Sequence, residues 1–273
     1  MHLSMSGRYV SFTILLIVAF AVAPVSAGDV KQNGRIAFTG NQSGTWQLYT
    51  MNPNGSDITR ITNLPANNAE GFLPDFSPDG LRIVFCFGVF PIAAPVPQAE
   101  IYVINVDGSG LQQLTHDGLF DCAPRWSPDG SRIVFARESP RTHRTVVATM
   151  RPDGTHVKNL TSDLWGTFRA AFTSDGKRIV FESQQAGFIS VLWIMNKDGS
   201  QQRRLTPAPI KAGGPAVSSK DLIVFGDNLN SPISLTNTLL TMNLDGGNRR
   251  QITRPQGISH DVGANYSPDG KKL

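Results

Sequence analysis

The sequence has 273 residues and a formal net charge of +4, and charged residues make up 17% of it. This excess of positive charge is too small for nucleic-acid recognition, which needs a concentrated basic face. No linker or low-complexity segment divides the chain, so we expect a single domain after any targeting segment.

The N-terminal segment has the organisation of a secretory signal. Arg8 precedes an apolar run from Val10 to Val22, which is followed by the small residues of 23–27. We therefore expect residues 1–27 to be a signal peptide cleaved after Ala27, and residues 28–273 to form the exported protein in the periplasm or outside the cell. A membrane anchor is the alternative, but the apolar run is shorter than the ~20 residues that span a bilayer.

The rest of the chain repeats itself. The tetrapeptide Ser-Pro-Asp-Gly begins at Ser77, Ser127 and Ser267, and degenerate copies occupy 173–176 and 218–221. Successive copies are separated by 50, 46, 45 and 49 residues. Spacings of roughly 40 to 50 residues are typical of propellers in which one repeat is a four-stranded blade.

The order of elements inside each repeat is constant. The tetrapeptide is followed by an apolar β-rich strand, a second strand, an Asn-Gly or Asp-Gly turn, and a short strand that ends in Leu-Thr or Ile-Thr. Proline, aspartate and glycine at these positions favour tight turns between antiparallel strands. The first strands after the tetrapeptide are predicted at 82–85, 132–135, 178–181 and 222–225. A further copy of this strand, at 35–38, has no tetrapeptide before it. The terminal threonines are Thr62, Thr115, Thr161, Thr206 and Thr253.

These repeats carry a family resemblance. The segments Trp126–Phe135 and Ile101–Ser109 resemble the propeller repeat of the TolB-like family. The resemblance implies an all-β propeller of four-stranded antiparallel blades, and it implies a protein- or peptide-binding role in the cell envelope. Similar repeats accompany peptidases of the tricorn and prolyl oligopeptidase groups, so they imply architecture more firmly than activity. TolB also has an α/β domain before its propeller, for which we expect no room between the signal and Arg35.

The ends of the chain predict how the ring closes. The first repeat, which starts at Arg35, lacks an innermost strand, whereas the last repeat supplies one at 264–268 and little else. We expect the C-terminal strand to pair with 35–38, because closing the ring removes open sheet edges. This closure gives five blades, and a truncated six-bladed form is the alternative.

Recognition is expected on the face opposite the constant turns, because irregular loops on a rigid frame carry function. The apolar loop that follows Phe85 is the longest of its kind, with Phe87 and Phe90 as candidate anchors; it could equally fold over a blade end. Cys86 and Cys122 fall on the same face of adjacent blades, and an exported chain favours a disulfide between them over two buried free thiols.

Four polar residues precede the innermost strands, where connections converge on the axis. Together they could bind a cation, a basic peptide or a sugar, although residues of this kind are more often solvated groups at a rim or caps of adjacent turns. These candidate binding residues are Glu70, Asp121, His260 and Asp261.

Sequence motifs for catalysis are missing. The chain has no Gly-x-Ser-x-Gly, His-Glu-x-x-His or Cys-x-x-Cys motif and no phosphate-binding glycine loop. We therefore expect no enzyme activity, no cofactor and no metal, and a monomeric, non-catalytic scaffold for a protein or peptide partner in the envelope. The alternative is a carbohydrate-binding or lyase-type propeller, which would need several histidines on the axis; only His260 qualifies.

Overall fold

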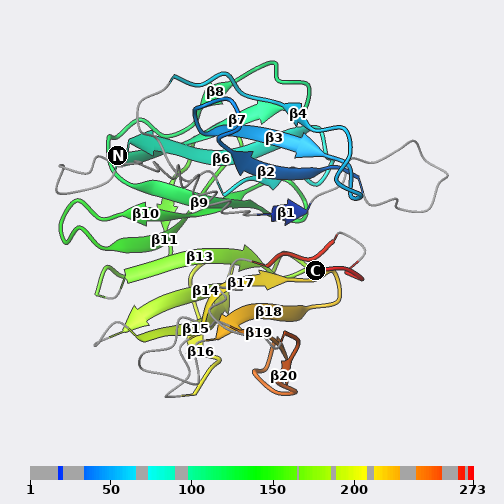
Figure 1. The fold of residues 1–273 in the computed structure, drawn as a ribbon. Coiled ribbons are helices and arrows are strands. Elements are labelled where there is room, and N and C mark those ends of the chain that lie inside the picture. The colour runs from blue at the N-terminus through cyan, green and yellow to red at the C-terminus, as the bar shows by residue number, and fades with distance from the viewer. Residues whose placement is uncertain are drawn as a thin grey trace, which may run out of the picture.

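A computed structural model describes residues 18–20, 34–65, 73–89, 98–164, 166–185, 189–207, 212–227, 238–253, 264–267 and 270–273. This part of the chain contains β-strands and no helix, and so no helix within it could cross a membrane. Twenty strands form five four-stranded antiparallel sheets, which follow one another in chain order as the blades of a propeller (Figure 1). The predicted fold class and number of blades are confirmed.

Each blade runs from an inner strand to a two-residue outer strand. Blade 1 contains β1 (Val18–Phe20), β2 (Ile36–Gly40), β3 (Gln47–Met51) and β4 (Thr59–Arg60). Blade 2 contains β5 (Asp75–Phe76), β6 (Arg82–Val89), β7 (Gln98–Asn105) and β8 (Gln112–Gln113). Blade 3 contains β9 (Asp121–Trp126), β10 (Ile133–Glu138), β11 (Thr145–Met150) and β12 (Lys158–Asn159).

Blades 4 and 5 repeat this order. Blade 4 contains β13 (Gly166–Phe172), β14 (Arg178–Gln185), β15 (Ile189–Asn196) and β16 (Arg203–Arg204). Blade 5 contains β17 (Ala212–Val217), β18 (Leu222–Asp227), β19 (Thr238–Asn243) and β20 (Arg250–Gln251).

The Ser-Pro-Asp-Gly turn is held by its own side chains. In blade 3 the Ser127 amide donates to the Arg132 carbonyl at 2.8 Å, and the Ser127 hydroxyl donates to Asp129 at 2.6 Å. Asp129 also accepts from the Ser131 amide at 3.0 Å. These bonds lower the pKa of Asp129 to about 2, the Ser127 hydroxyl being the largest cause. The tetrapeptide therefore satisfies its polar groups locally, which explains why it or a degenerate copy precedes the second strand in blades 2 to 5.

The terminal threonine extends each short outer strand by one bond. The Thr62 hydroxyl accepts from the Leu48 amide at 2.9 Å, and the Thr206 hydroxyl accepts from the Leu192 amide at 3.0 Å. The same bond recurs in every blade. Since the outer strands have only two residues, the hydroxyl replaces a carbonyl that a longer strand would have offered. The other three pairs are Thr115 with Ile101, Thr161 with Val147 and Thr253 with Leu239.

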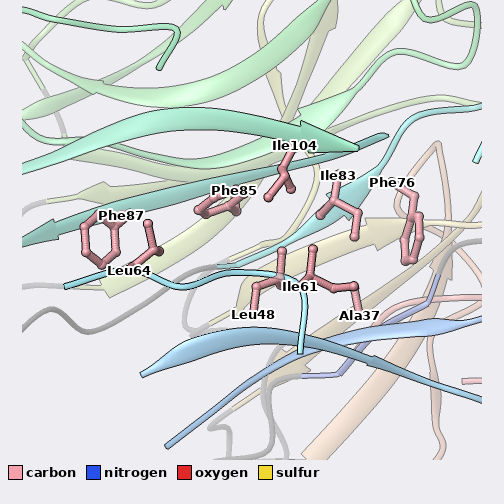
Figure 2. Close-up of a cluster of buried hydrophobic side chains, with 9 residues drawn as sticks. All are labelled: Ala37, Leu48, Ile61, Leu64, Phe76, Ile83, Phe85, Phe87 and Ile104. Atoms are coloured by element: carbon pink, nitrogen blue, oxygen red, sulfur yellow. The ribbon is translucent and has the colours of Figure 1, made fainter. Parts of the chain in front are cut away.

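The hydrophobic core lies between neighbouring blades. Phe85, Phe135, Phe181 and Phe225 occupy equivalent positions on the second strands, and each is at most 2% exposed. Figure 2 shows the cluster between blades 1 and 2, in which side chains of blade 2 face those of blade 1. Similar clusters join blade 2 to blade 3, blade 3 to blade 4 and blade 4 to blade 5.

A second contact recurs at these four blade junctions. The glycine of each Asp-Gly turn packs against the carbonyl of the residue before the terminal threonine in the preceding blade. A Cβ added to Gly154 would lie 2.5 Å from the Leu114 carbonyl oxygen. The corresponding glycine of blade 1, Gly55, has open space around the same position.

The junction between blade 5 and blade 1 is different. Ile252 of blade 5 is 44% exposed, whereas its equivalent Leu205 in blade 4 is 6% exposed. Among the described residues no core cluster joins these two blades. The C-terminal turn instead packs on blade 5, because a Cβ on Gly270 would meet the Ser219 hydroxyl at 2.9 Å.

The predicted pairing of the C-terminal strand with 35–38 is wrong in this structure. The inner position of blade 1 is taken by β1, with Val18 opposite Phe38 and Phe20 opposite Ile36. β1 comes from the apolar run assigned to the signal, and an apolar extended segment satisfies the edge of β2 equally well. Residues 264–267 belong to no strand and lie beside blade 5 near the axis.

Candidate functional site

Four of the predicted binding residues cannot be placed. Glu70, Phe90, His260 and Asp261 lie outside the described residues. Their roles stay predictions.

Phe87 belongs to the core and is not an exposed anchor of a loop. It lies within β6, opposite Glu100 of β7, and is 9% exposed. Its ring meets Tyr102 edge to face at a centroid distance of 6.1 Å, and Figure 2 shows it beside Leu64. The two strands of this hairpin are eight residues each, so the connecting loop begins later than the sequence predicts.

Cys86 and Cys122 form a disulfide with a Cα–Cα distance of 5.0 Å. The bond links β6 of blade 2 to β9 of blade 3, and both residues are buried in a small cluster with Ala99. It lies at the face of the propeller opposite the constant turns. A covalent bond at this position fixes the inner strand of blade 3 against its neighbour.

Asp121 is buried and is not a solvated rim group. It is the first residue of β9, is 0% exposed, and lies beside Glu100 and Asp117. Burial raises the pKa of Asp121 to about 7, against the lowering effect of Arg137, and the two neighbouring carboxylates add to the rise. A guanidinium nitrogen of Arg137 is 3.6 Å from the Asp121 carboxylate.

An axial hollow opens where the inner strands end and their turns begin. It has a volume of about 390 Å³, and every repeat from blade 2 to the C-terminal segment contributes to its wall. The lining includes aromatic side chains, turn residues and one ion pair. Its main members are Phe76, Trp126, Phe172, Ser219, Asn265 and Tyr266, with Asp75 and Arg125.

The ion pair in this hollow is held in place by the backbone. Arg125 lies 3.5 Å from the Asp75 carboxylate, which also accepts from the Trp126 amide at 2.8 Å. Burial raises the pKa of Asp75, and this effect exceeds the lowering by Arg125 and by the Trp126 amide. The Arg125 side chain is 25% exposed, so part of it is accessible from the hollow.

A second arginine, Arg169, lies on the inner strand of blade 4, β13. Burial lowers the pKa of Arg169, while Glu182 opposes that change. The Glu182 carboxylate accepts from the Gly214 amide at 2.9 Å, which ties it to the inner strand of blade 5. Arg125 and Arg169 thus lie on the inner strands of blades 3 and 4, and the charge of Arg125 adds to the lowering of the Arg169 pKa.

A second hollow of about 640 Å³ lies between blades 3 and 4 on the same turn face. Its charged lining is mainly basic, and Lys158 donates to the Asp198 carbonyl at 3.1 Å. The charged and titratable residues are Arg132, His156, Lys158 and Lys197, with Asp129 and Asp198. Both hollows lie on the face formed by the constant turns. The sequence predicted recognition on the opposite face, because the recurring turn residues indicated only a structural role.

The fold and the axial hollow together define a β-propeller with four-stranded blades. Successive repeats line its axial hollow. Residues 72–236, more than half of the chain, match the family model described as the TolB beta propeller domain, and the chain belongs to this family.

Individual relatives agree with this assignment. The Tol-Pal system protein TolB of Francisella tularensis subsp. tularensis (strain SCHU S4) is 28% identical over 164 residues, covering 60% of this chain and 36% of the relative. The chain spans less than half the length of the first curated relatives that it matches.

Solved structures show the same fold. A TolB candidate from Agrobacterium tumefaciens superimposes with a TM-score of 0.73 at 20% identity, covering 93% of this chain and 86% of that chain. TolB from Acinetobacter baumannii gives a TM-score of 0.67 at 22% identity, covering 82% and 53%.

Proposed function

We propose that this chain is an exported, non-catalytic propeller that binds a protein or peptide partner in the cell envelope through its axial hollow. Membership of the TolB propeller family and similarity to proteins of the Tol-Pal system support the envelope role. The signal-like N-terminus supports export, and a disulfide is stable in an oxidising compartment outside the cytoplasm. Cleavage after Ala27 would remove β1, so in the exported chain the inner edge of β2 would be open to another strand.

The axial hollow is the observation that carries this proposal. Its volume of about 390 Å³ falls within the range of specific binding sites and admits a short loop or a chain end of a partner. Aromatic walls formed by Phe76, Trp126 and Phe172 offer apolar contacts. Arg125, which is partly exposed in the hollow, offers a charge-assisted hydrogen bond to a carboxylate of the partner.

The lining does not favour the carbohydrate-active alternative. A lyase-type centre would need histidines converging on the axis, and none of the described residues that line the hollow is a histidine. Asp75 is occupied by Arg125 and the Trp126 amide, which suits positioning of a charge better than proton transfer. These features support the proposed binding role over the carbohydrate-active alternative.

Site-specific photo-cross-linking in the native host tests the proposal. A cross-linking amino acid at the exposed Ser219, in the hollow, should capture one envelope protein, whereas the same probe at the exposed Leu111, on the outer edge of blade 2, should not. Arg125→Gln should reduce capture and Arg60→Gln, on the outer strand β4, should leave it unchanged. Equal adducts at Ser219 and Leu111, or a protein retained in the cytoplasm, would refute the proposal.

A further inference from the structure

Three carboxylates from two blades converge beside the disulfide. Glu100 lies on β7 of blade 2, Asp117 lies in the connection after β8, and Asp121 begins β9 of blade 3. One carboxylate oxygen from each lies within 4.8 Å of those of the other two. Like charges at this separation repel one another unless a cation lies among them.

The burial of Asp121 is a second observation, independent of the grouping of the three carboxylates. Its side chain is fully buried, and neither carboxylate oxygen accepts a hydrogen bond within the described structure. Buried carboxylates are nearly always hydrogen-bonded or bound to a metal, because leaving one without partners is costly. The unsatisfied oxygens belong to the same carboxylate that approaches Glu100 and Asp117.

The charge near the cluster is incomplete. Arg137 forms an ion pair with Asp117, but its distance of 3.6 Å from Asp121 is too long for a hydrogen bond. One guanidinium against three carboxylates leaves an excess of negative charge when all three are ionised.

The other two carboxylates are held in place by bonds that leave lone pairs available. Glu100 accepts from the Gly118 amide at 2.7 Å through one oxygen and from the Thr115 hydroxyl through the other. Each carboxylate oxygen has two acceptor directions, so these bonds orient Glu100 without saturating it. A preorganised oxygen cluster of this kind suits a hard cation.

We propose that Glu100, Asp117 and Asp121 form a Ca²⁺ site at the junction of blades 2 and 3. Oxygens bound to Ca²⁺ at about 2.4 Å lie at most about 4.8 Å from one another, which agrees with the observed grouping. The donor set consists of oxygen alone, and the nearby Cys122 is in a disulfide, so thiolate-bound zinc does not fit. Solvent oxygens complete the coordination on the side of Asp117, the most exposed of the three.

The site would work together with the disulfide. Both cross the same junction, since Cys86 and Glu100 come from blade 2, whereas Cys122 and Asp121 come from blade 3. Bound Ca²⁺ therefore stabilises the start of the inner strand of blade 3, and this inference does not depend on the proposed partner binding.

Calcium titration of the purified full-length protein after EDTA treatment tests the site. Isothermal calorimetry should detect one Ca²⁺ per chain, and a concentration about 100-fold above the Kd should raise the Tm by roughly 5–10 °C. Asp121→Asn and Asp117→Asn should abolish both responses. Asp107→Asn, which changes an exposed turn carboxylate of blade 2 outside the cluster, should leave them unchanged.

Each outcome decides the proposal. Absence of heat and of a Tm change at millimolar Ca²⁺ overturns it, as does an unchanged response in both cluster variants. If Asp121→Asn fails to fold by circular dichroism, Asp117→Asn decides alone, because that side chain is partly exposed and its amide keeps the same shape. Loss of the response in the Asp107→Asn control would also refute this location.

Discussion

The junction between blades 2 and 3 and the junction between blades 5 and 1 are formed from the same repeat but differ in packing. At the first, Leu114 is 5% exposed, Gly154 contacts its carbonyl, and a disulfide joins the two blades. At the second, Ile252 is 44% exposed, and Gly55 has open space around it. The contrast shows that a blade contact belongs to a pair of repeats, because one repeat supplies only half of the packing surface.

Truncating the two equivalent aliphatic residues should give the largest difference. Leu114→Ala should lower the free energy of unfolding by about 2–5 kcal/mol, because it empties a buried position. Ile252→Ala should change it by about 0.5 kcal/mol, because the side chain is already in contact with water. Urea unfolding followed by circular dichroism measures both. Equal losses would show that the junction of blades 5 and 1 is packed like the others.

Removal of the disulfide should give the next largest effect. The sequence separation of 36 residues predicts a loss of about 2–4 kcal/mol for the double substitution Cys86→Ala and Cys122→Ala. Reduction of the wild-type protein should lower its urea midpoint similarly and should leave the double variant unaffected. Free thiols in the protein purified from its native host without reductant, detected by mass spectrometry after alkylation, would contradict the bond.

The matched glycines should show the smallest difference of the three. Gly154 and Gly55 both have a φ of +83°, so alanine carries the same backbone penalty at either position. Gly154→Ala adds a collision with the Leu114 carbonyl and should cost about 1–3 kcal/mol more than Gly55→Ala. Differential scanning calorimetry of the two variants gives the difference. Identical Tm values would mean that the close approach at blades 2 and 3 is relaxed in solution.

Two sequence-based predictions, the position of Phe87 and the closure of the ring, are wrong for different physical reasons. β6 and β7 are eight residues long, so Phe87 lies in a strand of the core and not in the predicted loop. The sequence did not predict this length, because strand length depends on how far a hairpin packs on its neighbour. The predicted closure by the C-terminal strand is wrong because another extended apolar segment, β1, occupies the edge of β2, and the repeat pattern does not specify which segment pairs there.

The candidate site was predicted only in part. Asp121 is visible in the sequence as an acidic residue before an inner strand, but its partners Glu100 and Asp117 have no common spacing with it. They meet because Ala99 pairs with Phe120 across two blades. The sequence did not predict the axial hollow, because the recurring turns around it indicate only connections between strands.

The sequence by itself determined the repeat, its turns, the four-stranded blade and the threonine that ends it, since each depends on residues a few positions apart. Only the tertiary structure decided which junctions are packed, where the acidic cluster lies and which face is hollowed. These features depend on contacts between residues of different blades, which the local pattern of a single repeat does not specify.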